Sequence, residues 1–134
     1  MSGNTLLLNL LLLLTTSPAE AQTVAQAETR ALAGVWSVDL SARPDEPYFK
    51  SMRLDLLPDG RLSGSFYDSD IEAGRWTSSH GRLCVAFRTT DGVGPYHTAA
   101  CLDGDRVLGQ TWAEHRDFLF LWSADRPAPS GAGD

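Results

Sequence analysis

Apolar and polar residues alternate with a period of two along most of this chain, and turn signals recur about every ten residues. The alternation is clear at Met52, Leu54 and Leu56, where a charged residue separates each apolar residue from the next. A period of two is typical of a β-strand with one buried face, whereas a helix would show a period of 3.6. Short strands at regular spacing predict a sandwich or a barrel. The chain therefore belongs to the all-β class.

Eight strands fit between the turn signals, and no segment among them is long enough to form a crossover helix. The strands must then be joined by hairpins, which predicts an eight-stranded antiparallel up-and-down meander. Closing the meander into a barrel removes the exposed edges that an open sheet would present. The predicted strands cover residues 34–39, 49–57, 61–67, 71–78, 82–89, 96–102, 106–113 and 117–124.

The amino-terminal segment carries the features of a signal peptide. An apolar stretch over 6–14, interrupted only by Asn9, precedes a small-x-small site at 19–21, and signal peptidase recognises this arrangement. The stretch is shorter than the roughly 20 apolar residues that a membrane-spanning helix needs. A second small-x-small site at 25–27 leaves the cleavage point open. We expect a periplasmic or secreted protein without membrane insertion.

Cleavage after residue 21 would leave 113 of the 134 residues, which is enough for one domain. The predicted organisation is a signal peptide over 1–21, a lead-in of at most one helical turn over 22–32, a single barrel over 33–126 and a disordered tail over 127–134. The net charge is −6 for the whole chain and −5 once Glu20 is removed. Nucleic acids attract clustered positive charge, so we expect no nucleic-acid partner.

The two cysteines, Cys84 and Cys101, predict one disulfide in an exported protein. A pair of buried free thiols is the alternative, and the spacing of the cysteines does not fit a metal site. In a hairpin of strands 82–89 and 96–102, the two cysteines fall opposite each other, where side chains are close enough to bond. The bond would close a loop of about 17 residues and stabilise the fold by on the order of 3 kcal/mol.

Alternation assigns one face of each strand to the interior. The predicted inward residues are Trp36, Val38, Met52, Leu54, Leu56, Leu62, Phe66, Leu83, Val85, Phe87, Tyr96 and Trp112. The segment 118–122 is apolar on both faces, so one face must lie outside the core. Monomers rarely leave such a strip in water. We therefore expect a homodimer contact through 118–122.

The first strand begins with Gly34-Val35-Trp36, a Gly-x-Trp motif, and Arg126 follows the last strand. Together these features resemble the calycin group of barrels, which contains the lipocalins, the fatty-acid-binding proteins and the avidins. The resemblance implies that Trp36 caps the closed end of the barrel and that Arg126 stacks on its indole ring. A cation over an indole face is a favourable contact.

Three short runs, at 59–66, 85–88 and 101–112, are similar to runs of the avidins. They resemble Asp-Gly-x-Leu-Thr-Gly-Thr-Tyr, Val-x-Trp-Lys and a strand that ends in Thr-x-Trp. However, Phe66 stands where avidins have a Tyr that bonds the ureido oxygen of biotin, and Phe87 stands where they have a Trp. A buried polar group left unpaired costs about 1–3 kcal/mol. We therefore expect no tight binding of biotin.

Few residue clusters indicate catalysis or metal binding. Asp68, Asp70 and Glu72 offer oxygen ligands for calcium, but a solvated turn explains the same acidic group. No two of the three histidines share a metal-ligand spacing. We therefore expect no metal and no cofactor. A hydrolase or isomerase site around His97, Arg88 and Asp68 remains an alternative.

Aromatic residues dominate the predicted interior, and such a lining is typical of small-molecule pockets and of filled cores alike. We predict an exported barrel that binds a small apolar ligand and has no catalytic role. The alternative is a non-catalytic envelope module with a filled core that contacts other proteins. The candidate ligand-binding residues are Trp36, Phe66, Phe87, Tyr96, Thr98, Gln110 and Trp112.

Overall fold

The computed structural model describes residues 3, 11–15 and 17–129. One helix, α1 (Pro18–Leu32), precedes the strands, and a 3-10 helix, η1 (Glu114–Arg116), precedes the last strand. The strands are β1 (Gly34–Asp39), β2 (Phe49–Leu56), β3 (Arg61–Phe66), β4 (Ser69–Asp70), β5 (Glu72–Ser79), β6 (Arg82–Thr90), β7 (Pro95–Asp103), β8 (Arg106–Ala113) and β9 (Phe118–Asp125).

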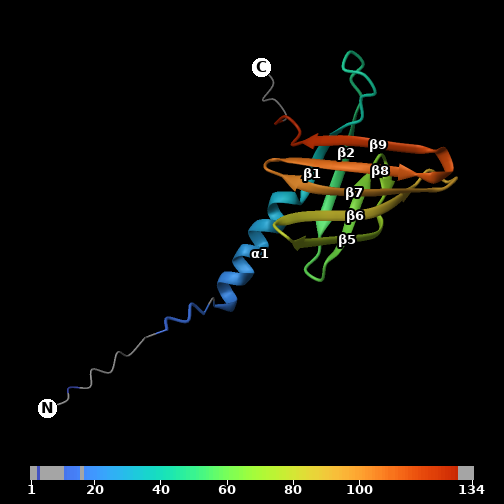
Figure 1. Ribbon diagram of the computed structural model, residues 1–134. Helices are drawn as coiled ribbons and strands as arrows, with labels where there is room; N and C mark the ends of the chain where they lie inside the picture. The colour runs from blue at the N-terminus through green and yellow to red at the C-terminus, as the bar shows by residue number, and fades with distance from the viewer. Residues whose placement is uncertain (1–2, 4–10, 16, 130–134) are drawn as a thin grey trace.

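All strand pairs are antiparallel, in the order β2-β1-β9-β8-β7-β6-β5-β3-β4, and β2 also pairs with β3. Strands β9, β8, β7, β6 and β5 lie side by side in this order (Figure 1). The pairing of β2 with β3 closes the sheet, so the predicted up-and-down barrel is confirmed. Each of the eight predicted strands agrees with an observed strand to within one residue at either end. The two-residue strand β4 was not predicted, and it pairs with the end of β3.

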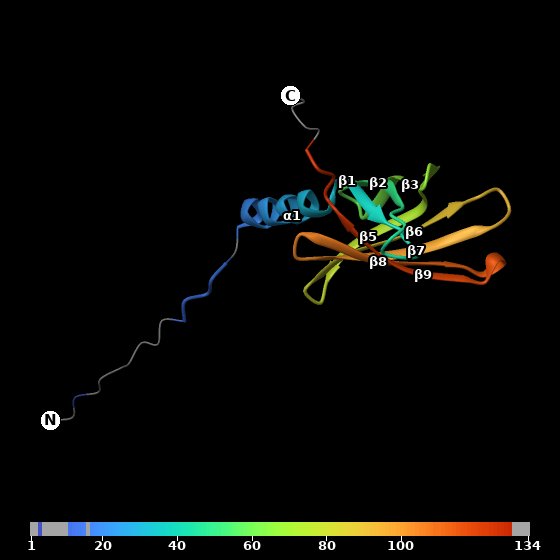
Figure 2. The same ribbon diagram turned by 90° about the horizontal axis from the view of Figure 1, so that it is seen from above.

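Helix α1 extends away from the barrel at the end where β1 begins (Figures 1 and 2). The prediction of at most one helical turn before the barrel is wrong, because α1 has 15 residues. A capping box starts this helix: the Ser17 hydroxyl accepts from the backbone N–H of Glu20, and the Glu20 carboxylate accepts from that of Ser17. Pro18 at the first helical position favours the same start.

The predicted signal peptide and the predicted tail both include residues that the structure does not describe. The signal peptide over 1–21 includes residues 1–2, 4–10 and 16, which lie outside the described part of the chain, and it stays a prediction. The same holds for residues 130–134 of the predicted tail, whereas 127–129 have no regular secondary structure. No helix within the described ranges is long and apolar enough to cross a membrane.

The closed end of the barrel is sealed by Trp36 and Arg126. The Trp36 side chain is 1% exposed, and its indole N–H donates to the carbonyl of Leu32 at 2.8 Å. The Arg126 guanidinium lies 3.8 Å from the centre of the Trp36 ring. This is the stacking that the calycin resemblance implies. Gly34 has φ +99°, and a Cβ there would lie 3.2 Å from the Arg126 guanidinium.

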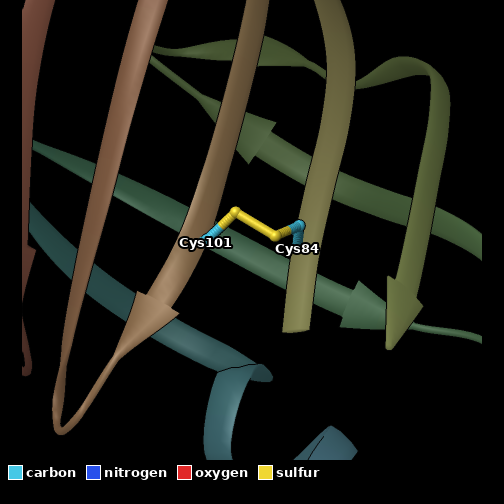
Figure 3. Close-up of a disulfide and its surroundings, with 2 residues drawn as sticks. All are labelled: Cys84 and Cys101. Atoms are coloured by element: carbon cyan, nitrogen blue, oxygen red, sulfur yellow. A yellow bond between two sulfur atoms is a disulfide. The ribbon is translucent and has the colours of Figure 1, made fainter. Parts of the chain in front are cut away.

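The disulfide between Cys84 and Cys101 is confirmed, with the sulfur atoms 2.01 Å apart. The two residues face each other on β6 and β7 (Figure 3). The same register pairs Arg88 with His97. Alternation along two strands was therefore sufficient to predict the hairpin and its cross-link.

Strand β8 presents the opposite face to the one predicted. The assignment of Trp112 to the interior is wrong, because this side chain is 40% exposed on the outside of the barrel. Gly109 faces inward instead and pairs with Trp122 of β9. A Cβ at Gly109 would lie 2.4 Å from the Trp122 indole, so the absent side chain makes room for this ring. Trp122 is 5% exposed and takes the interior place predicted for Trp112.

Strand β9 has apolar residues on both faces, as predicted. Phe120 and Trp122 point into the barrel, while Leu119 and Leu121 are 61% and 72% exposed. The remaining predicted inward residues are buried, except that Leu56 and Tyr96 are only half-buried. The outer face of β9 is therefore apolar at positions 119 and 121.

Candidate functional site

A cavity of about 840 Å³ opens at the end of the barrel opposite Trp36 and Arg126. It lies where β1, β3 and β6 end and where β7 and β9 begin, so four hairpins and turns contribute to it. The lining residues are Leu40, Ala42, Tyr48, Phe66, Tyr67, Asp68, Ser69, Thr89, Thr90, Asp91, Tyr96, Thr111, His115, Arg116, Phe118 and Phe120. Such a volume is in the range of small-molecule pockets.

Aromatic rings form the deep wall of the cavity. The Phe66 ring lies 5.5 Å from Trp122 and 6.1 Å from Phe87, centre to centre, with an edge-to-face arrangement in the second pair. Towards the mouth, Phe118 and Phe120 stack at 5.6 Å on the inner face of β9. Offset and edge-to-face contacts of this kind stabilise aromatic clusters. The deep wall of the cavity is consequently apolar.

One rim of the mouth is organised by Asp91. Its carboxylate accepts hydrogen bonds from two backbone N–H groups of its own turn, from Arg116 Nε at 2.7 Å and from the Tyr96 hydroxyl at 3.0 Å. His115 Nε2 lies 3.2 Å from the same carboxylate. The bond from the Gly94 N–H, followed by the other donors, holds the pKa of Asp91 well below its usual range. Asp91 thus ties the β6–β7 hairpin to η1.

The other rim carries a pair of tyrosines. The hydroxyls of Tyr48 and Tyr67 are hydrogen-bonded to each other, and Lys50 Nζ lies 5.0 Å from the centre of the Tyr67 ring. Lys50 also donates to Asp68 at 3.0 Å. The bond from Tyr48 and partial burial raise the pKa of Tyr67. Each tyrosine therefore places an aromatic ring and a polar hydroxyl at the rim.

Buried hydroxyls supply the polar groups inside. Thr111 Oγ1 lies 2.9 Å from Thr98 Oγ1 and accepts from Trp122 Nε1 at 3.0 Å. Thr89 is 5% exposed and lines the cavity. No fully buried side-chain nitrogen or oxygen in the described part of the chain lacks a partner. Because the Thr89 hydroxyl bonds to no described residue, it must be open to the cavity.

The structure brings only some of the predicted ligand-binding residues together. Phe66 and Tyr96 line the cavity, and Phe87 packs directly behind Phe66. Thr98 is buried beside the cavity and bonds to Thr111, which lines it. Trp36, by contrast, lies in the core at the closed end.

Gln110 and Trp112 are on the wrong face to contact a ligand in this cavity. Both lie outside the barrel, beside a shallow hollow of about 410 Å³ above Ala86 and Ala99. Leu108 and Trp112 lie on the same outer face of β8 as Gln110, and the inner face of this strand is apolar as well. Alternation alone therefore could not assign the two faces of β8.

Sequence reasoning missed most of the mouth of the cavity. Phe118 and Phe120 could have been predicted, because they lie on the same face as Trp122 in a strand that is apolar on both faces. No pattern in the sequence marks Asp91 as a site residue, because an aspartate before a glycine is typical of any turn. Its contacts with His115 and Arg116 span 24 and 25 residues and depend on the pairing of β6, β7 and β8, which places the two turns side by side.

The residues of the alternative catalytic site do not meet. Arg88 and His97 lie on the outer face beside the shallow hollow, whereas Asp68 lies at the mouth of the cavity. The proposed calcium ligands are also engaged elsewhere, because Asp68 bonds to Lys50 and Glu72 bonds to Arg88. Within the described residues, no group of three or more His, Cys, Asp or Glu side chains could hold a metal ion.

Comparisons of the chain with known protein families, with curated proteins and with solved structures found no match. The closed antiparallel barrel is consistent with a calycin-like fold.

Proposed function

We propose that this protein binds a small, largely apolar molecule in the cavity at the open end of the barrel, without catalysing a reaction. The observation that carries the proposal is the 840 Å³ cavity with an aromatic deep wall. Ligand pockets combine apolar and aromatic walls with a few polar groups that fix orientation. Here Phe66, Phe118 and Phe120 are the walls, and Thr89 and Thr111 are the polar groups inside.

The absence of catalysis is proposed because the reactive side chains near the cavity are held in other contacts. A general base must reach the proton that it removes. His115 bonds to Asp91, which already accepts from Arg116, Tyr96 and two backbone groups. This network engages one ring nitrogen of His115, and no described serine, threonine or cysteine side chain bonds to the other, so His115 has no nucleophile to activate.

We place the protein in the periplasm or outside the cell. A disulfide in a small domain indicates an oxidising compartment, and the predicted signal peptide would deliver the chain there. A ligand met in that compartment would enter through the mouth between Tyr48 and Tyr96, which both line the cavity.

Native mass spectrometry of the full chain, purified from an oxidising compartment, tests the ligand proposal. We expect a small adduct that is lost when the protein is denatured, and its mass would narrow the identity of the ligand. A clean apo mass, together with no binding of a neutral fluorescent probe such as N-phenyl-1-naphthylamine, would contradict the proposal.

A second candidate is an interaction between two copies of the chain through the outer face of β8 and β9. Leu119 and Leu121 are 61% and 72% exposed there, and Trp112 is 40% exposed. The shallow hollow above Ala86 and Ala99 lies on the same face. Protruding side chains and a hollow on one surface suit an isologous contact, in which each copy fills the hollow of the other. We therefore name a second copy as the partner.

A further inference from the structure

The charged side chains around the cavity already neutralise one another. Among the described residues that line it, Arg116 and His115 bond to Asp91, and Asp68 bonds to Lys50. An ionised ligand would lose its hydration on entering and would find no free opposite charge as a replacement. The distribution of charge therefore favours an uncharged ligand.

The buried hydroxyl pair has two possible arrangements of its hydrogens. An indole N–H only donates, so Trp122 must donate to Thr111 Oγ1. If Thr111 in turn donates to Thr98, the hydrogen of Thr98 has no acceptor among the described side chains, in a residue that is 3% exposed. If Thr98 donates instead, the remaining hydrogen belongs to Thr111, which lines the cavity. The second arrangement leaves no buried donor unpaired once an acceptor enters the cavity.

We infer that the cavity takes an uncharged, largely apolar molecule that carries a hydrogen-bond acceptor, such as a carbonyl oxygen, and that the Thr111 hydroxyl donates to it. This inference rests on the proposed function and adds the chemical class of the ligand. Phe120, the cross-strand partner of Thr111, and Phe66, which packs on Trp122, supply apolar surface near the acceptor site. The open hydroxyl of Thr89 is a second point at which a polar group of the ligand pairs.

A matched pair of probes tests the role of Thr111. Fluorene and 9-fluorenone share one ring skeleton, and only fluorenone carries a carbonyl. The measured quantity is the ratio of their two affinities, followed by quenching of tryptophan fluorescence. We expect Thr111→Val to lower the fluorenone-to-fluorene ratio about tenfold relative to the unsubstituted protein, as expected for the loss of one hydrogen bond.

Thr98→Val is the control variant. It also removes one hydroxyl from the buried pair, but it leaves the Thr111 hydrogen free, so the ratio should stay within about twofold. Because both affinities are measured on the same variant, a change in the folded fraction cancels from the ratio. An unchanged ratio in Thr111→Val would overturn this inference while leaving the ligand proposal standing, provided that both probes bind.

The charge of the ligand is tested with a second pair. N-phenyl-1-naphthylamine and 8-anilinonaphthalene-1-sulfonate share their aromatic rings and differ by one sulfonate. We expect the neutral probe to bind at least about tenfold more tightly. Tighter binding of the sulfonate would overturn the assignment of an uncharged ligand. Failure of every probe to bind, combined with a clean apo mass, would overturn the proposed function as well.

Discussion

Arg126 connects three parts of the chain at the closed end of the barrel. Its guanidinium stacks on Trp36 and donates to the carbonyls of Val35 and Ala31, at 3.2 and 3.0 Å. A lysine could not reproduce both the planar stacking and the two separate donors. The residue therefore fixes the end of α1 against the start of β1.

Replacement of this side chain tests that role. We expect Arg126→Ala to lower the free energy of unfolding by about 1–3 kcal/mol, because a cation–π contact and two hydrogen bonds are lost. Arg126→Lys should recover only part of the loss. Urea denaturation measures both variants. An Arg126→Ala protein with an unchanged denaturation midpoint would show that the stacking contributes nothing to stability.

Asp91 makes the stability of the mouth dependent on pH. Since the pKa of Asp91 is lower in the folded protein than in the unfolded chain, ionised Asp91 stabilises the fold above its unfolded pKa, near 3.9. That contribution decreases as the pH falls below about 4 towards the folded pKa.

We expect Asp91→Asn to be less stable than the unsubstituted protein at neutral pH, with the difference shrinking between about pH 4 and pH 2. Thermal denaturation across this range measures the effect. Asp117→Asn, at an exposed turn, is the control and should leave the acid profile unchanged. A difference that is independent of pH would contradict the linkage.

At the scale of elements, the two faces of β9 belong to the two candidate functions: the inner face to the ligand cavity and the outer face to the proposed contact between copies. Phe120 faces the cavity, and its neighbour Leu119 faces solvent. We expect Phe120→Ala to weaken binding of N-phenyl-1-naphthylamine about tenfold, through the loss of buried aromatic surface. Leu119→Ala, which removes a side chain from the outer face of the same strand, should change the affinity less than twofold. Equal effects of the two substitutions would exclude the cavity as the probe site.

The strands differ in how far their pattern determined their structure. In β6 and β7 the alternation was unambiguous, so the faces, the hairpin register and the Cys84–Cys101 bond were all predictable. In β8 both faces carry apolar residues, and the packing of Trp122 on Gly109 determines which face points into the barrel. Contacts between separate strands leave no periodic trace in the sequence.

The amino-terminal helix and part of the candidate site depend on features other than periodicity. The Ser17–Glu20 capping box is a local signal for α1 that does not appear as a repeat of apolar residues. Phe66 and Tyr96 could be placed in the cavity because their strands alternate. Asp91, His115 and Arg116 could not, because they meet only when the β6–β7 turn and η1 lie side by side at one end of the paired strands.

At the scale of the whole molecule, the apolar outer face leads to a prediction about assembly. We expect Leu121→Asp to convert a dimer to a monomer, because it would place a charge in the centre of the proposed contact. Sedimentation velocity measures the change. Val93→Asp, which alters an equally exposed apolar residue in the β6–β7 turn, is the control and should remain dimeric. If the unsubstituted chain stays monomeric at high concentration, the proposed self-association is wrong.

The barrel is sealed where α1 arrives and β9 finishes, and the cavity opens at the far end. A bead, a sensor surface or a fluorescent partner attached beyond either of these two elements would thus sit behind the sealed end. Immobilised in this way, the protein would present its entrance to the surrounding solution, and capture of a ligand could be followed without steric obstruction from the point of attachment.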